Sequence, residues 1–175
     1  RSVVMPITLS DTLDVEVTDD GLITSDTGYD DDLCVKAARI LKSSVSTLPS
    51  SIGAAIRVTK RIPAGGGLGG GSADAAAVLR ALNELWEIGF SREELAEVGA
   101  QVGSDVPALV MGGPVVMEGR GEKVAPLSDL QPSTFNLVLV NPGVHSSTKE
   151  VYAACEARPL DGENATEKMV AALKT

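Results

Sequence analysis

The sequence predicts an α+β fold, in which strands and helices are grouped instead of alternating regularly. Apolar and polar residues alternate over Leu13–Val17 and Ala54–Ile62, which predicts two strands, and Val3–Ile7 predicts a third. Two helical patterns, one running to Trp86 and the next opening at Ser91, follow each other with no strand pattern between them. We therefore expect an α+β fold and not a regular βαβ alternation, because a βαβ repeat would place a strand between consecutive helices.

Local signals predict the remaining elements. Asp20-Gly21 marks a turn, and apolar residues recur at helical spacing over Leu33–Leu41. Ser91 and Glu94 have the spacing of a capping box, which predicts the start of a helix. The other expected strands and helices are Pro114–Glu118, Phe135–Val140, Ser147–Ala157 and Glu163–Leu173, of which the first two are strands.

Length and composition fit one globular domain and exclude several classes of protein. The chain has 175 residues and a formal net charge of −9, with an isoelectric point near 4.6. This balance argues against a nucleic-acid partner, because phosphate backbones attract clustered Lys and Arg. No apolar run reaches the roughly 18 residues of a membrane span, so we expect a cytoplasmic protein without a membrane partner. Cys34 and Cys155 belong to no Cys/His cluster and are expected to be reduced thiols.

A glycine-rich run is the feature that points to a function. Six of the eight residues from Gly65 to Ser72 are glycine, and alanines follow directly. Glycine gives up the most backbone entropy on ordering, so such a run is retained where backbone must approach a ligand closely or take unusual dihedral angles. Bare N–H groups at the N-terminus of a helix bind phosphate, and the helix dipole adds to the attraction. The run therefore favours a nucleotide-binding kinase.

Other interpretations of the run stay open at this point. A Walker loop is excluded, because Gly70-Gly71-Ser72 carries no lysine. The spacing of Gly65, Gly67 and Gly70 does satisfy a dinucleotide-binding pattern, but a second helix follows where that fold needs a strand. A connector that lets helices pack closely is the remaining alternative. Elsewhere, His145 has no evident catalytic partner. Lys60 and Arg61 flank the run and could screen phosphate charge, but they are interpreted as solvated strand ends.

The segment Arg61–Ala76, RIPAGGGLGGGSADAA, resembles the central phosphate-binding motif of the GHMP kinases, which include galactokinase and homoserine and mevalonate kinases. The resemblance is strongest to the branch that acts in the non-mevalonate pathway to isoprenoid precursors. Other segments agree in the family's order, namely Asp11-Thr-Leu, Leu33–Leu41, Gly103–Pro107 (GSDVP), Gly119–Glu122 (GRGE), and Asn141–Val144 followed by Ser147-Thr148. The resemblance implies the GHMP-kinase N-terminal fold, similar to domain 2 of ribosomal protein S5, with a mixed sheet and packed helices.

The resemblance also implies cofactors and roles for individual residues. ATP and Mg²⁺ are the expected cofactors, with Asp105 as the catalytic carboxylate and Ser72 as a ligand of phosphate or Mg²⁺. Asp105 and Ser72 each have an alternative as a helix cap, and Tyr152 as a packed helix aromatic. The substrate-binding residues would be Thr148 and Tyr152, with Tyr152 stacked on a cytosine ring. The phosphate-binding residues would be Pro63, Gly65, Gly66, Gly67, Leu68, Gly69, Gly70, Gly71 and Ser72.

The sequence departs from the family pattern in three ways. The family's first strand, with its lysine, would precede this chain, and about a hundred further residues would follow it. We therefore expect residues 1–158 to form the ATP-binding domain without its first strand, 159–175 to begin a truncated second domain, and the fragment to be inactive. Asp32 stands where the family has asparagine near adenine, or else caps a helix. The alternatives to this kinase are a homoserine- or mevalonate-type kinase and a non-catalytic nucleotide-binding remnant.

Overall fold

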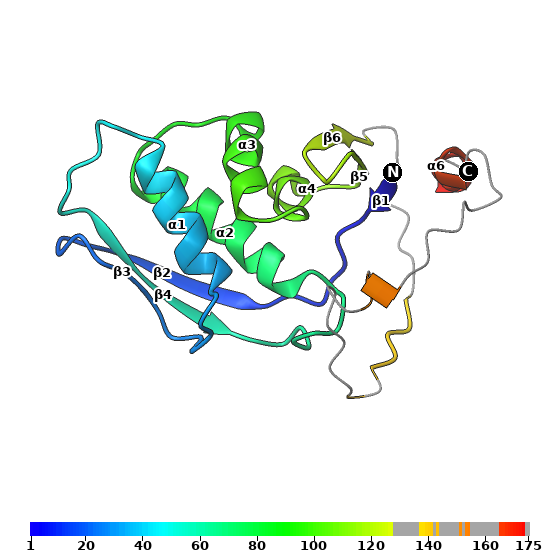
Figure 1. The fold of residues 1–175 in the computed structure, drawn as a ribbon, viewed down its shortest axis with the longest axis horizontal. Coiled ribbons are helices and arrows are strands. Elements are labelled where there is room, and N and C mark those ends of the chain that lie inside the picture. Colours follow the sequence, from blue (N-terminus) through cyan, green and yellow to red (C-terminus); the bar gives the residue numbers. More distant parts are fainter. Residues whose placement is uncertain (128–136, 142, 144–150, 152, 155–164, 174–175) are drawn as a thin grey trace.

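The larger of two sheets has the strand order β2-β4-β3. The computed structural model describes residues 1–127, 137–141, 143, 151, 153–154 and 165–173. Strand β2 (Thr12–Thr18) runs antiparallel to β4 (Gly53–Thr59), and β3 (Ile23–Ser25) runs parallel to β4 on its other side. The strands predicted from alternation are confirmed, although β4 ends at Thr59 and not at Ile62. Strand β3 is too short to show a period. The sheet is mixed, as expected (Figure 1).

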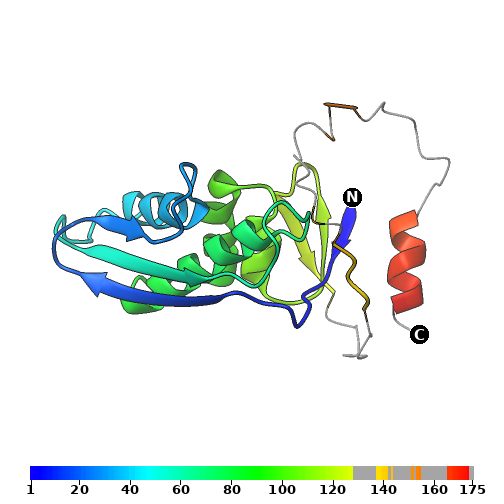
Figure 2. The same ribbon diagram turned by 90° about the horizontal axis from the view of Figure 1, so that it is seen from below.

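A second sheet lies beside one end of the helical layer (Figures 1 and 2). Its strand order is β1-β5-β6. Its strands are β1 (Ser2–Val4), β5 (Val115–Glu118) and β6 (Lys123–Pro126), and all the pairings are antiparallel. The predicted strand Val3–Ile7 is thus correct in kind but ends at Val4. Pro6 explains the early end, because proline has no N–H to donate to a sheet.

Four helices lie on one side of the larger sheet, and two of them pack against its strands (Figure 2). They are α1 (Leu33–Ser43), α2 (Gly70–Leu85), α3 (Arg92–Val102) and the short α4 (Val106–Met111). Helix α2 is central, since it contacts each of the other three and also β2. The core contains side chains that are fully buried, among them Leu41, Ile56, Leu79, Leu82 and Val106. Helix α3 follows α2 directly, so the dinucleotide-binding alternative is wrong and the α+β prediction is confirmed.

The capping box at the start of α3 is present as predicted. The Ser91 hydroxyl accepts a hydrogen bond from the Glu94 amide at 3.2 Å, and the Glu94 carboxylate accepts one from the Ser91 amide at 2.8 Å. These reciprocal bonds satisfy two amides that the first turn of a helix leaves without partners.

The C-terminal part of the chain agrees less well with the predictions. Helix α6 (Ala165–Leu173) lies beside β1 and confirms most of the predicted helix Glu163–Leu173. The strand predicted at Phe135–Val140 is wrong over Leu137–Val140, where the described residues form no strand and all four side chains are exposed. An apolar run indicates a strand only if a partner strand is available, which the sequence does not reveal. The helix predicted at Ser147–Ala157 lies largely outside the described residues.

Within the described ranges, no helix combines the length and apolar character that a bilayer crossing requires.

Candidate functional site

The glycine-rich run joins the end of β4 to α2 as a loop with left-handed backbone. Gly65, Gly67 and Gly69 have φ angles of 70°, 70° and 68°, a region that residues with a Cβ rarely adopt. Helix α2 begins within the run, with Gly69 as its N-cap and Gly70 as its first residue. The glycines therefore provide three left-handed backbone positions and the first turn of a helix.

The N–H groups of this loop are largely uncommitted. Among the described residues, the only amide from Gly65 to Ser72 that has an acceptor is that of Gly66, which donates to the Pro63 carbonyl at 3.2 Å. The N-cap Gly69 has no side chain to accept from the first turn of α2. The amides of Gly70, Gly71 and Ser72 therefore remain available at the positive end of a 16-residue helix, an arrangement that favours anions.

Ser72 is the third residue of α2, so its interpretation as the N-cap is wrong; Gly69 occupies that position. The helix starts earlier than the glycine content suggests, because tertiary packing overrides helix propensity. The Ser72 hydroxyl oxygen lies 4.0 Å from the point that a Cβ on Gly103 would occupy. The fold thus brings Ser72 next to the Gly103–Pro107 segment, which is distant in sequence.

Asp105 is exposed and holds the N-cap position of α4, but its side chain makes no capping hydrogen bond. The carboxylate also has no ion-pair partner among the described residues. The cap alternative is therefore correct about the position of Asp105 and wrong about the use of its side chain. A carboxylate that helix α4 does not engage is free to interact with a ligand.

The backbone around Asp105 is held by the second sheet. Gly121 lies in the turn between β5 and β6, with a φ angle of 112°, and it is buried. A Cβ placed on Gly121 would overlap the carbonyl oxygen of Ser104. The turn therefore packs directly against the peptide that precedes Asp105.

Apolar side chains from two other helices support the N-terminus of α2. A Cβ on Gly71 would lie 3.6 Å from Cδ1 of Leu33, at the start of α1. A Cβ on Gly69 would lie 4.0 Å from Cδ1 of Leu109 in α4. The loop thus leads into a helix end that is flanked by α1 and α4.

Lys60 is not a solvated strand end, so that interpretation is wrong. Its ammonium contacts the carboxylates of Asp11 at 2.5 Å and Asp74 at 2.7 Å. The side chains of Asp11 and Asp74 are only 1% and 6% exposed, and that of Lys60 is 27% exposed. The alternation pattern could not reveal this cluster, because it depends on the pairing of β2 with β4.

Asp32 is a structural cap, which confirms one of its two alternatives. One carboxylate oxygen accepts from the Cys34 amide at 2.7 Å and the Val35 amide at 3.4 Å, and the other accepts from the Thr27 hydroxyl at 2.5 Å. Burial alone would raise the pKa of Asp32, but these hydrogen bonds outweigh burial and lower it. The ionised carboxylate is therefore committed to the start of α1.

Three residues singled out from the sequence, His145, Thr148 and Tyr152, lie outside the described residues.

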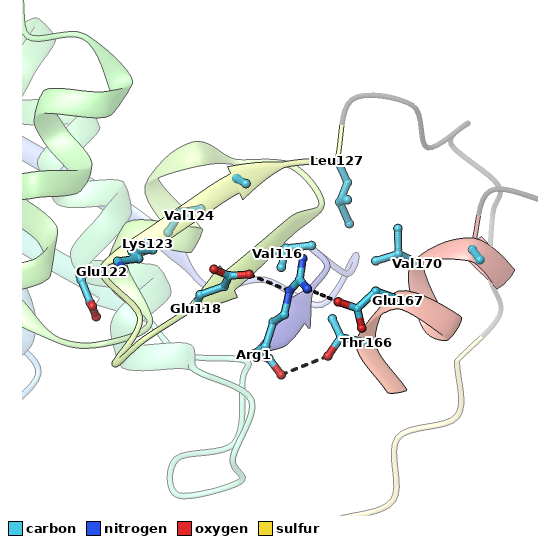
Figure 3. Close-up of a pocket in the computed structure, with 12 residues that line it drawn as sticks. Arg1, Val116, Glu118, Glu122, Lys123, Val124, Leu127, Thr166, Glu167 and Val170 are labelled. Carbon is cyan, nitrogen blue, oxygen red and sulfur yellow. Dashed lines mark hydrogen bonds and ion pairs between the residues drawn. The ribbon is translucent and has the colours of Figure 1, made fainter. Parts of the chain in front are cut away.

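A cavity of about 750 Å³ opens between the second sheet and α6. Figure 3 shows Arg1 there, bridging Glu118 of β5 and Glu167 of α6, with Val116 and Val170 nearby. No residue of the glycine loop or of the Gly103–Pro107 segment lines this cavity. The cavity is therefore separate from the candidate site.

Comparison with known proteins agrees with this geometry. Residues 32–113, which include the glycine loop, α2 and Asp105, match the model of the GHMP kinases N terminal domain. The matched segment is therefore a GHMP kinase N-terminal domain.

Individual relatives share a more specific name. The chain is 50% identical over 127 residues to the 4-diphosphocytidyl-2-C-methyl-D-erythritol kinase of Xanthomonas euvesicatoria pv. vesicatoria, covering 73% of this chain and 41% of the relative. It is 37% identical over 179 residues to the kinase of the same name from Brevibacillus brevis, covering 99% of this chain and 60% of the relative. A crystal structure of 4-(cytidine 5'-diphospho)-2C-methyl-D-erythritol kinase superposes with a TM-score of 0.70 at 30% identity, covering 98% of this chain and 60% of that one. The chain thus spans roughly half the length of the relatives it matches.

Proposed function

We propose that this chain binds ATP at the glycine loop and belongs to a kinase that phosphorylates a hydroxyl group of 4-diphosphocytidyl-2-C-methyl-D-erythritol. One observation carries the proposal: the uncommitted amides at the start of α2 lie beside the segment that presents the free carboxylate of Asp105. The name shared by the relatives supports the choice of substrate. In this proposal the enzyme acts in the cytoplasm, in the non-mevalonate pathway to isoprenoid precursors.

The loop fits a chain of phosphates. Its left-handed glycines leave the backbone open, and the amides of Gly70, Gly71 and Ser72 supply donors at a helix N-terminus. Pro63 and Leu68 complete the proposed phosphate-binding segment. ATP supplies the phosphoryl group that is transferred, while the protein's own role is to fix the position of the phosphates and to stabilise their charge.

Mg²⁺ is proposed to bind together with the nucleotide. The described residues contain no group of three His, Cys, Asp or Glu side chains that could hold a metal ion by themselves. Mg²⁺ commonly keeps several waters and binds through one or two protein oxygens plus the substrate's phosphates. The Ser72 hydroxyl is the protein oxygen that we assign to this role.

Asp105 is proposed to act on the acceptor. Its carboxylate accepts a hydrogen bond from the substrate hydroxyl. It takes the proton as that oxygen bonds to the γ-phosphorus of ATP and the bond from this phosphorus to the departing ADP breaks. Thr148 and Tyr152 are proposed to bind the substrate, with the Tyr152 ring against the cytosine. The ATP-binding domain is proposed to span residues 1–158, with 159–175 opening a second domain.

The test uses calorimetry for binding and ADP release for turnover. The chain is titrated with ATP, with and without Mg²⁺, and the full-length gene product is then assayed with the diphosphocytidyl alcohol, homoserine and mevalonate. The proposal expects ATP binding and turnover of the diphosphocytidyl alcohol alone. Preference for another alcohol would reassign the substrate, and ATP binding without turnover by the full-length product would indicate a non-catalytic remnant.

A further inference from the structure

Lys60, Asp11 and Asp74 connect both ends of the glycine loop through one ion cluster. Lys60 directly follows β4, where the loop begins, whereas Asp74 belongs to α2, where the loop ends. Asp11 directly precedes β2, which pairs with β4 so that Thr12 is opposite Thr59. Three segments that are separated in sequence therefore meet beneath the loop.

Asp11 holds the first residues of the loop through their backbone. One of its oxygens accepts from the amides of Arg61 at 2.5 Å and Ile62 at 2.8 Å, and the other contacts Lys60. The Asp11 side chain is thus fully used, in a place where only 1% of it is exposed. Buried carboxylates with this many partners hold their neighbours in fixed positions.

Lys60 extends this contact to the helix. Its ammonium is 2.7 Å from an oxygen of Asp74, in the second turn of α2. A Cβ on Gly70 would lie 2.9 Å from Cγ2 of Ile62 and 3.4 Å from Nζ of Lys60. The first residue of α2 therefore rests on the same two residues that start the loop.

The opposite charges of Lys60 and its two carboxylate partners compensate for the partial burial of the cluster. Burial acts to lower the pKa of Lys60, but its hydrogen bonds to Asp11 and Asp74 outweigh burial and raise the pKa. Burial raises the pKa of Asp74, and the ion pair with Lys60 only partly offsets this effect. Removing the lysine would leave two carboxylates facing each other beneath a site that is proposed to bind an anion.

We propose that Asp11, Lys60 and Asp74 form a clamp that sets the spacing between the two ends of the glycine loop, and so tunes its affinity for nucleotide phosphates. This inference rests on the proposed function for its ligand. The three are positioning residues, because their side-chain atoms are committed to one another and to the Arg61 and Ile62 amides.

The decisive comparison is among three variants. Lys60→Met keeps the length of the side chain and removes the charge, Lys60→Arg keeps the charge, and Arg57→Met removes a cation from an exposed pair with Glu16 on the same two strands. Each is titrated with ATP by calorimetry at a temperature where circular dichroism shows it folded. We expect Lys60→Met to weaken ATP binding about tenfold or more, the effect of losing one charged hydrogen bond. Lys60→Arg and Arg57→Met should stay within about threefold of the wild type.

Two variants of the carboxylates and a measurement of amide hydrogen exchange without ATP complete the test. Asp74→Asn keeps an acceptor for Lys60 and should retain ATP affinity, whereas Asp11→Ala should lose it and speed the hydrogen exchange of the Arg61 and Ile62 amides. If Lys60→Met does not fold, Asp11→Ala and Asp74→Asn decide the question in the same way. Equal ATP affinity in all folded variants, or equal weakening by Lys60→Met and Lys60→Arg, would overturn the clamp.

The clamp and the proposed function can fail separately. If the wild-type chain and the full-length product both fail to bind ATP, the proposed function fails. The clamp is then judged by exchange at Arg61 and Ile62, where unchanged rates in Asp11→Ala would overturn it.

Discussion

Gly121 packs against the carbonyl oxygen of Ser104, so a turn of the second sheet fixes the peptide that leads into Asp105. This contact leaves no room for a side chain, and the φ angle of 112° at Gly121 independently disfavours one. The exposed carboxylate of Asp105 is therefore placed by a residue on a different element.

Gly121→Ala should impair turnover of the full-length enzyme while leaving ATP binding largely intact. The added methyl group must displace Ser104, and a shift of about 1 Å in a reacting group can cost about 100-fold in rate. Gly113→Ala is the matched control, because nothing lies within 4 Å of a Cβ at that glycine. Steady-state kinetics with calorimetry separate the two effects, and equal turnover in both variants would contradict the assigned role of the turn.

Gly69→Val should abolish or strongly weaken ATP binding. Gly69 has a φ angle of 68° at the N-cap of α2, so valine there strains the loop and fills the space proposed for phosphate. Gly89→Val is the control, because Gly89 has a comparable φ angle of 80° beyond the other end of α2. We expect both variants to melt at a lower temperature and only Gly69→Val to lose ATP affinity in calorimetry; equal affinities would remove the phosphate role from this loop.

Asp105→Asn should lower kcat by about 100- to 10,000-fold, the usual contribution of a general base. The substitution keeps the size of the side chain and removes the charge that accepts a proton. The melting temperature and ATP affinity should not change, because the carboxylate makes no capping bond. Full activity of the variant in an ADP-release assay would show that the base lies elsewhere.

Asp32→Ala should destabilise the fold by about 1 kcal/mol near neutral pH, the usual cost of losing an N-cap. The pKa of Asp32 is lowered from 3.8 in the folded chain, so the ionised cap contributes fully above pH 3.8 and its contribution is lost as pH falls below that value. The difference in unfolding free energy between wild type and variant should therefore shrink in acid. Denaturant titrations at several pH values measure this difference, and a difference that stays constant with pH would contradict the cap.

Local patterns predicted those parts of the fold that depend on neighbours in sequence. The alternation in β2 and β4, the helical spacing in α1 and the capping box of α3 are all local, and each was confirmed. Strand β3 has three residues, too few to show a period of two. The error at Leu137–Val140 has a related cause, since an apolar run does not reveal whether a partner strand exists.

In the candidate site too, the sequence reveals the local motifs but not the contacts between distant segments. The glycine loop was visible in the sequence because its composition is extreme, and Asp105 because it sits in a recognisable segment. Lys60 was misjudged, since its two partners reach it only through strand pairing and the packing of α2 on β2. The support of Ser104 by Gly121 likewise depends on how the second sheet meets α4, which no local pattern encodes.

The two parts of the candidate site, the glycine loop and Asp105, are positioned by different sheets. The glycine loop follows β4 of the larger sheet, while the peptide before Asp105 packs against the turn between β5 and β6 of the second sheet. Helix α4 touches α2 on one side and β5 and β6 on the other, so it acts as the spacer between them. Lengthening or shortening apolar side chains on α4 would therefore change the distance between the glycine loop and Asp105 without altering either motif. Under the proposed function, this distance would decide the size of the alcohol that fits between them.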